Sequence, residues 1–150
     1  MSLPIDIRPA TPDDAPFVLA AWMRALNNQR HYGPTMDADD AWLVAMQALL
    51  LTTLDKARTL IAHRPGHPDQ AYGFVVAEDR PTNPILHWVY VKHLNRRERV
   101  ATRLLAKAIE GFGTRNVHMP FMSDAFKHHR SRWRLHYRPD RLHGLMPQSE

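Results

Sequence analysis

Apolar and polar residues alternate with two different periods along the chain, and the changes of period divide it into strands and helices. Ile5, Ile7 and Ala10 alternate with polar residues and predict a strand over 5–10, and the motif Thr11-Pro12-Asp13-Asp14 predicts the start of a helix. The expected helix ends near 27–28. Its apolar face consists of Phe17, Val18, Ala21, Trp22, Ala25 and Leu26, spaced three and four apart.

A second helix and a hairpin follow in the pattern. Asp37, after the Gly33-Pro34 turn, is the expected cap of a helix that reaches about residue 54. Two runs rich in β-branched and aromatic residues, 58–63 and 71–78, flank a turn-rich loop over 64–69 and predict a hairpin. The apolar stripe of the helix contains Trp42, Met46, Leu49 and Leu50.

The last third begins with the run 85–91, which contains no turn residues and predicts a central strand. The next helix is expected to end at Gly111 or Gly113. A strand over 117–122, a short helix over 124–133 and an extended piece over 135–137 complete the order. The apolar face of the long helix consists of Val100, Leu104, Leu105, Ala108, Ile109 and Phe112.

The length and composition narrow the class of protein. A chain of 150 residues, 44% hydrophobic, predicts one globular domain over 1–150, with 139–150 ordered only by docking. The absence of cysteine excludes disulfides, zinc-thiolate sites and thiol nucleophiles. We expect a cytoplasmic protein with no membrane partner, because no apolar run is long enough to span a bilayer and no leader opens the chain.

Charge is distributed unevenly between the two parts of the chain. Residues 1–91 carry seven Lys+Arg and ten Asp+Glu, whereas 92–150 carry thirteen and five, so the C-terminal part has a charge of +8. Such a surface attracts anions. Arginines also alternate there with Trp133, His136 and Tyr137, so a nucleic-acid-binding module remains an alternative function, although no motif of such a module is present.

The stretch 88–105 carries the strongest chemical signal. A central strand leads through a short basic loop directly into an amphipathic helix, whose first backbone N–H groups have no partner within the helix. Arg96, Arg97, Arg99 and Arg103 add positive charge at this end. The junction therefore predicts a phosphate site.

The chain resembles the GCN5-related N-acetyltransferase superfamily in three features. These are the order of elements, the opening Ile7-Arg8-Pro9-Ala10-Thr11-Pro12-Asp13-Asp14, and the match of Arg96 and Ala101 to a Gln/Arg-x-x-Gly-x-Gly/Ala motif. The resemblance implies an α+β fold with a mixed sheet of six to seven strands and about four helices. It implies an enzyme that transfers acetyl from acetyl-CoA, as co-substrate, to an amine by direct attack. The acceptor is a small molecule or a protein, and a homodimer is a reasonable expectation.

The same resemblance assigns the residues that hold coenzyme A. Backbone groups of Val89, Tyr90 and Val91 would bind the pantetheine arm. Arg99 replaces the usual first glycine of the motif, so its side chain must point away from the pyrophosphate. The segment that would bind the pyrophosphate comprises Arg96, Arg97, Glu98, Arg99, Val100, Ala101 and Thr102.

Acetyl transfer requires a proton acceptor for the amine. Some family members place a glutamate at the position of Ile85, so His87, or Glu78 through a water, are the candidates here, with His87 preferred. The family often uses a helix tyrosine as the acid, and His129 or Tyr137 are the candidates in this chain. An exposed strand-end carboxylate is the simpler expectation for Glu78.

Two further alternatives concern catalysis and metals. Arg99 and the missing tyrosine also fit a protein that binds coenzyme A without catalysis. The ten histidines raise the possibility of a metal site, but no pair has a third ligand at a suitable spacing, so no metal is expected.

Overall fold

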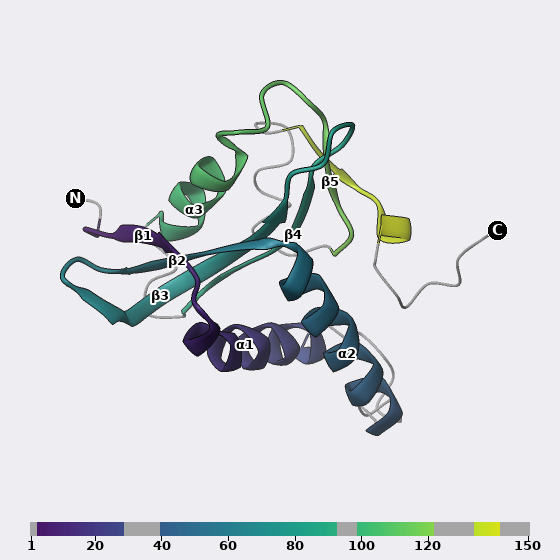
Figure 1. The fold of residues 1–150 in the computed structure, drawn as a ribbon, viewed down its shortest axis with the longest axis horizontal. Helices are drawn as coiled ribbons and strands as arrows, with labels where there is room; N and C mark the ends of the chain where they lie inside the picture. Colours follow the sequence, from purple (N-terminus) through teal and green to yellow (C-terminus); the bar gives the residue numbers. More distant parts are fainter. Residues whose placement is uncertain (1–2, 29–39, 93–98, 122–133, 142–150) are drawn as a thin grey trace.

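A computed structural model describes residues 3–28, 40–92, 99–121 and 134–141, and these form a six-stranded sheet with helices on both faces (Figure 1). All six strands are neighbours in chain order. The strands are β1 (Asp6–Pro9), β2 (Arg58–Arg64), β3 (His67–Glu78), β4 (Ile85–Val91), β5 (Val117–Met119) and β6 (Leu135–Tyr137). The helices are α1 (Ala15–Asn28), α2 (Asp40–Lys56) and α3 (Val100–Ile109), with short 3-10 turns η1 (Pro12–Asp14) and η3 (Pro139–Arg141).

The sheet is mixed, as the sequence predicted. Strands β1 to β4 pair antiparallel, whereas β5 pairs parallel with β4 and with β6. The six strands confirm the α+β prediction. The fourth expected helix, over 124–133, lies outside the described residues.

The two faces of the sheet hold different cores. The face toward α3 buries mainly aliphatic side chains from β2 to β6 and from α3 itself, and Ile7 of β1 packs partly buried against them. The face toward α1 and α2 is aromatic, with Trp22 stacked on Trp88 and Phe121 edge-on to both. Strand alternation, with a period of two, decides which side chain faces which layer.

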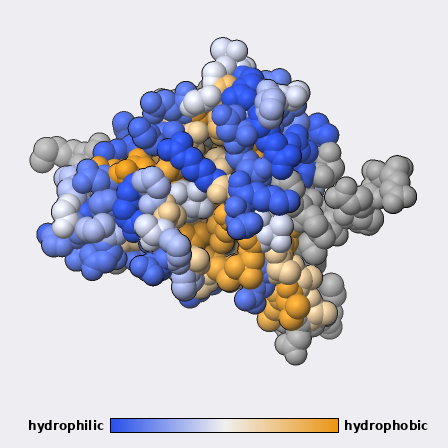
Figure 2. Space-filling model, in the orientation of Figure 1, coloured by the Kyte–Doolittle hydropathy of each residue, from blue (hydrophilic) through white to orange (hydrophobic). Residues whose placement is uncertain are grey.

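The outer side of α2 remains apolar. Figure 2 shows apolar side chains gathered at the surface over the helices α1 and α2. The large exposed ones on α2 are Leu43, Val44 and Leu51. No helix among the described residues is both long and apolar enough to cross a membrane.

Several element boundaries differ from those expected. The turn between β2 and β3 is confined to Pro65 and Gly66, with Gly66 at φ 77°, so Pro68 and Asp69 belong to β3 rather than to a loop. Strand β5 ends at Met119 rather than 122, because the next residue is a proline and has no N–H for a ladder. The expected docked tail begins with an ordered turn at η3.

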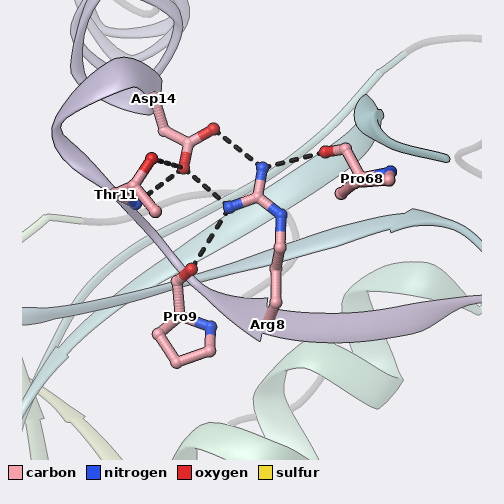
Figure 3. A network of polar contacts seen from close by, with 5 residues as sticks. All are labelled: Arg8, Pro9, Thr11, Asp14 and Pro68. Carbon is pink, nitrogen blue, oxygen red and sulfur yellow. Dashed lines mark hydrogen bonds and ion pairs between the residues drawn. The ribbon is translucent and has the colours of Figure 1, made fainter.

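A polar network fixes the entry into α1 (Figure 3). Both terminal nitrogens of Arg8 donate to the two oxygens of Asp14, at 2.7 and 2.9 Å, and one also donates to the Pro68 carbonyl at 2.9 Å. The Thr11 amide donates to Asp14 Oδ2 at 2.7 Å, which is the back-bond of a capping box. The predicted helix start is confirmed, and the network joins it to β1 and β3.

Candidate functional site

Strands β4 and β5 form a fork. Their one pairing among the described residues is Ile85 with His118, where the His118 amide donates to the Pro84 carbonyl at 2.8 Å. In the described part of the chain, no second residue pair joins β4 to β5. Backbone N–H and C=O groups along a strand edge can pair with an extended ligand that contains amides.

A bulge in β4 helps to open the fork. Val76 pairs with Trp88 but Ala77 pairs with Leu86, so His87 is an extra residue opposite β3. A bulge bends its strand and redirects the extra side chain. At the other arm, Pro120 follows β5 and cannot donate to a ladder.

His87 and Glu78 meet at this bulge. Their side chains are 1% and 8% exposed, and His87 Nε2 lies 2.8 Å from Glu78 Oε1. The second oxygen, Oε2, accepts from Arg80 Nε at 2.7 Å. The expectation of an exposed Glu78 is therefore wrong, because the bulge brings an imidazole over the strand end. The two candidate bases form one pair rather than two alternatives.

The charge on Glu78 is fixed by these partners. The hydrogen bond from His87, followed by that from Arg80, lowers the pKa of Glu78 to about 2, against the opposing effect of burial. An ionised carboxylate only accepts, so Nε2 of His87 carries a proton. In the neutral ring the lone pair is then on Nδ1, which makes Nδ1 the basic atom.

Arg115 holds the connection between β3 and β4 in place. Its guanidinium donates to Asp79 Oδ1 at 2.9 Å and to the carbonyl of Arg80. Asn83 donates to the Asn116 carbonyl at 3.1 Å. These bonds hold the connection that contains Arg80, and Arg80 in turn binds Glu78.

The residues expected to bind coenzyme A lie at the end of β4 and at the start of α3. Val89 and Val91 are buried against the α3 layer, so a ligand in the fork could reach only their backbone. Tyr90 is half-buried on the other face, beside Phe17. Arg96, Arg97 and Glu98 lie outside the described residues.

Arg99 forms the N-cap of α3 with a left-handed backbone, φ 60°. A glycine would adopt this conformation without strain, and the exposed arginine adopts it too. The first helical bond runs from the Arg103 amide to the Arg99 carbonyl, so the amides of Val100, Ala101 and Thr102 precede it and have no partner within the helix. Amides of this kind at a helix start can bind an anion.

The two candidate acids are not brought to the Glu78–His87 pair by the described structure. Tyr137 is 44% exposed and follows the buried Leu135 by two positions, which places it toward the α3 layer. Glu78 follows Phe74 and Val76, which belong to the opposite layer. His129 lies outside the described residues.

Sequence reasoning missed His118 and Arg80, and it counted Arg141 only among the arginines of the basic C-terminal part. His118 is buried on β5 and accepts a hydrogen bond at Nδ1 from Arg141 of η3, at 2.8 Å. Alternation with Val117 and Met119, both in the α3 layer, could have placed it on the same face as Glu78. Its pairing with Arg141 depends on contacts distant in sequence and has no local signal.

Comparison with known proteins identifies the fold. No sequence-family model matches the chain, and neither does any curated protein. Solved structures of acetyltransferases do match it. A GCN5-related N-acetyltransferase structure from Rhodopseudomonas palustris superposes with a TM-score of 0.59 at 20% identity, covering 88% of this chain and 81% of that one.

Two more structures agree. A structure described as a histone acetyltransferase and related acetyltransferase, from Corynebacterium glutamicum, gives a TM-score of 0.62 at 17% identity and covers 88% and 83% of the two chains. An acetyltransferase of the same family from Brucella melitensis, in complex with acetyl-CoA, gives 0.56 at 15% identity and covers 83% and 80%. The chain has the GCN5-related N-acetyltransferase fold.

Proposed function

We propose that the protein is an N-acetyltransferase that moves an acetyl group from acetyl-CoA to an amine of a small molecule or a protein. The observation that carries the proposal is the buried Glu78–His87 pair, set in the β4 bulge near the closed end of the fork. A histidine with a buried carboxylate partner is suited to accept a proton near neutral pH.

The fork and the start of α3 would bind the co-substrate. Backbone groups of β4 would bind the amides of the pantetheine arm, and the helix start lies beyond the same end of that strand. The unpartnered amides at residues 100–102 and the positive end of the helix dipole favour the pyrophosphate. The thioester would then lie near the bulge.

The reaction needs one proton removed from the amine. As the amine nitrogen bonds to the acetyl carbon, the C–S bond breaks and the sulfur keeps the electron pair. The amine proton passes to Nδ1 of His87, directly or through a water, and Glu78 stabilises the resulting imidazolium. His129 and Tyr137 remain the candidates to protonate the leaving sulfur.

The test is release of free coenzyme A from acetyl-CoA in the presence of amines, first with a panel of small amines and then with peptides. We expect acceptor-dependent release, and a loss of about 10²- to 10⁴-fold in kcat for His87→Gln. His63→Gln is the matched control, because His63 is also buried in the sheet but bonds the Arg64 carbonyl. Equal losses in both variants would contradict the role of His87.

The alternative function is nucleic-acid binding by the basic C-terminal part. Arg134, His136 and Arg138 lie exposed along and beside β6. If the protein binds no acetyl-CoA but binds DNA or RNA with an affinity that falls steeply with salt, the nucleic-acid module is the better account.

A further inference from the structure

A cleft lies at the opposite end of β3 from the Glu78–His87 pair. It has a volume of about 590 Å³ and is lined by the start of the first helix, the first residues of β3 and the end of β4. From Ala71, which lines the cleft, to Glu78, the strand β3 advances about 23 Å. A small ligand in this cleft therefore does not reach the proposed reaction centre, and the cleft is a separate candidate site.

One ion pair in the cleft lining is already satisfied within the fold. Arg8 and Asp14 both line the cleft, but they bind each other through two hydrogen bonds, and Arg8 also donates to the carbonyls of Pro9 and Pro68 (Figure 3). Their charges offset each other. Because this pair joins β1, the helix start and β3, it fixes the shape of the cleft and leaves ligand binding to other residues.

Three further charged side chains line the cleft and are not paired. Asp13, Asp69 and Lys92 are exposed, and in the described part of the chain none of their side chains forms an ion pair or a hydrogen bond. Lys92 lies over the ring of Phe17, with its ammonium nitrogen 5.3 Å from the ring centre. The ring is itself held edge-on against Phe74. The cleft thus presents two negative charges and one positive charge beside an apolar surface, with no contact between the opposite charges.

The spacing of these charges sets the length of a ligand that could join them. The Lys92 amide donates to the Tyr72 carbonyl at 2.8 Å, and Asp69 lies three residues earlier on β3, which is about 10 Å along the strand. Asp13 precedes Phe17 by four residues, which is about one helical turn or ~6 Å. The two charges of a free amino acid are too close together for this gap, whereas each added residue of a peptide separates them by up to about 3.5 Å more.

The cleft contains groups for both ends of a short peptide. We propose that it binds a di- or tripeptide with apolar side chains, whose N-terminal ammonium is held by Asp13 and Asp69 and whose C-terminal carboxylate is held by Lys92. Charged hydrogen bonds to the two ends supply the partners that these three side chains lack. The apolar side chains of the peptide lie against Phe17 and Ala71. Binding requires neither coenzyme A nor the proposed catalytic pair, so the inference is independent of the proposed function.

The test is a titration of the full-length protein with the dipeptide dileucine, followed by ¹⁵N NMR. We expect saturable shifts in the backbone amides of the cleft lining, at 13–17, 69–71 and 92. Two analogues each lack one charge, since the amide of dileucine has no carboxylate and N-acetyl-dileucine has no ammonium. Each analogue should bind about 3- to 10-fold more weakly than dileucine, as for the loss of one exposed charged hydrogen bond.

Two variants assign the charges of the cleft to the two ends of the peptide. Lys92→Met should bind dileucine no more tightly than its amide, because the carboxylate has lost its partner. The double variant Asp13→Asn, Asp69→Asn should bind dileucine no more tightly than N-acetyl-dileucine. Lys107→Met is the matched control, because Lys107 is exposed on α3 and lies outside the cleft lining. It should keep both preferences of the wild type.

Three results would overturn the inference. The first is the absence of saturable binding at millimolar peptide. The second is equal affinity for dileucine and its two analogues in the wild type. The third is unchanged preferences in Lys92→Met and in the double variant. In each case the acetyltransferase proposal stands, because release of coenzyme A tests it separately.

Discussion

Two carboxylates, Asp14 and Glu78, are held in similar ways but at different places. Each is paired with an arginine, and hydrogen bonds lower the pKa of each to about 2, chiefly from Arg8 for Asp14 and from His87 for Glu78. Asp14 is 15% exposed and lines an open cleft of about 590 Å³ at the start of the first helix. Glu78 is buried at the end of β3, beside the fork.

The difference between them lies in their partners. Asp14 accepts from a guanidinium and a backbone amide, and neither exchanges a proton near neutral pH (Figure 3). Glu78 accepts from an imidazole, the one side chain whose ordinary pKa lies near 6.5. A lowered carboxylate pKa is therefore common to a structural cap and a candidate active site, and the partner distinguishes them.

The largest expected contrast is in catalysis. Glu78→Gln should lower kcat about 100-fold, because the neutral amide no longer stabilises the His87 imidazolium. Asp14→Asn should change kcat less than about twofold, since the partners of Asp14 among the described residues, Arg8 and Thr11, belong to β1 and to the start of the first helix. The measurement is steady-state acetyl transfer by both variants, with circular dichroism to confirm folding. An equal loss of kcat in Asp14→Asn and Glu78→Gln would contradict the distinction between a structural Asp14 and a catalytic role for Glu78.

A smaller contrast is expected in acid stability. Both carboxyl groups have a lower pKa when folded, from 3.8 for Asp14 and 4.5 for Glu78 to about 2 for each. Their stabilisation is thus complete above about pH 4.5 and is lost as the pH falls toward about 2, by about 2 kcal/mol for Asp14 and about 3 kcal/mol for Glu78. Urea unfolding across this range should show a flatter pH dependence in Asp14→Asn and in Glu78→Gln. An unchanged slope in either variant would contradict the pairing of that carboxylate.

The smallest contrast concerns the arginines. Arg8→Lys should cost about 1–2 kcal/mol of unfolding free energy, because lysine cannot bond both oxygens of Asp14 and the Pro68 carbonyl at once. Arg80→Lys should cost less than about 1 kcal/mol, since Arg80 is 37% exposed. Urea unfolding near neutral pH measures both, and a larger cost at Arg80 would reverse the comparison.

The sequence predicted the layers better than it predicted the site. Periodicity placed the strands, the faces of the helices and the junction into α3, because these depend on local spacing. His87 and Glu78 were each noticed, but their contact depends on a one-residue bulge, and register between strands is a long-range property. Arg99 illustrates the same limit, since its left-handed backbone is invisible in a sequence that shows an arginine.

The extent of the turn was misjudged, and the place where the tail docks could not be predicted. Proline and glycine marked 64–69 as a loop, yet only Pro65 and Gly66 make the turn, because the extended backbone of β3 tolerates Pro68. The contact between Arg141 and His118 orders the start of the tail across 23 residues of sequence.

The central claim is that the fork and the start of α3 hold acetyl-CoA. Its most direct test is calorimetric titration of the purified protein with acetyl-CoA and with coenzyme A. The account predicts saturable micromolar binding near one molecule per chain, weakened by Thr102→Pro, which removes one amide of the helix start. Absence of binding by the wild type would contradict it.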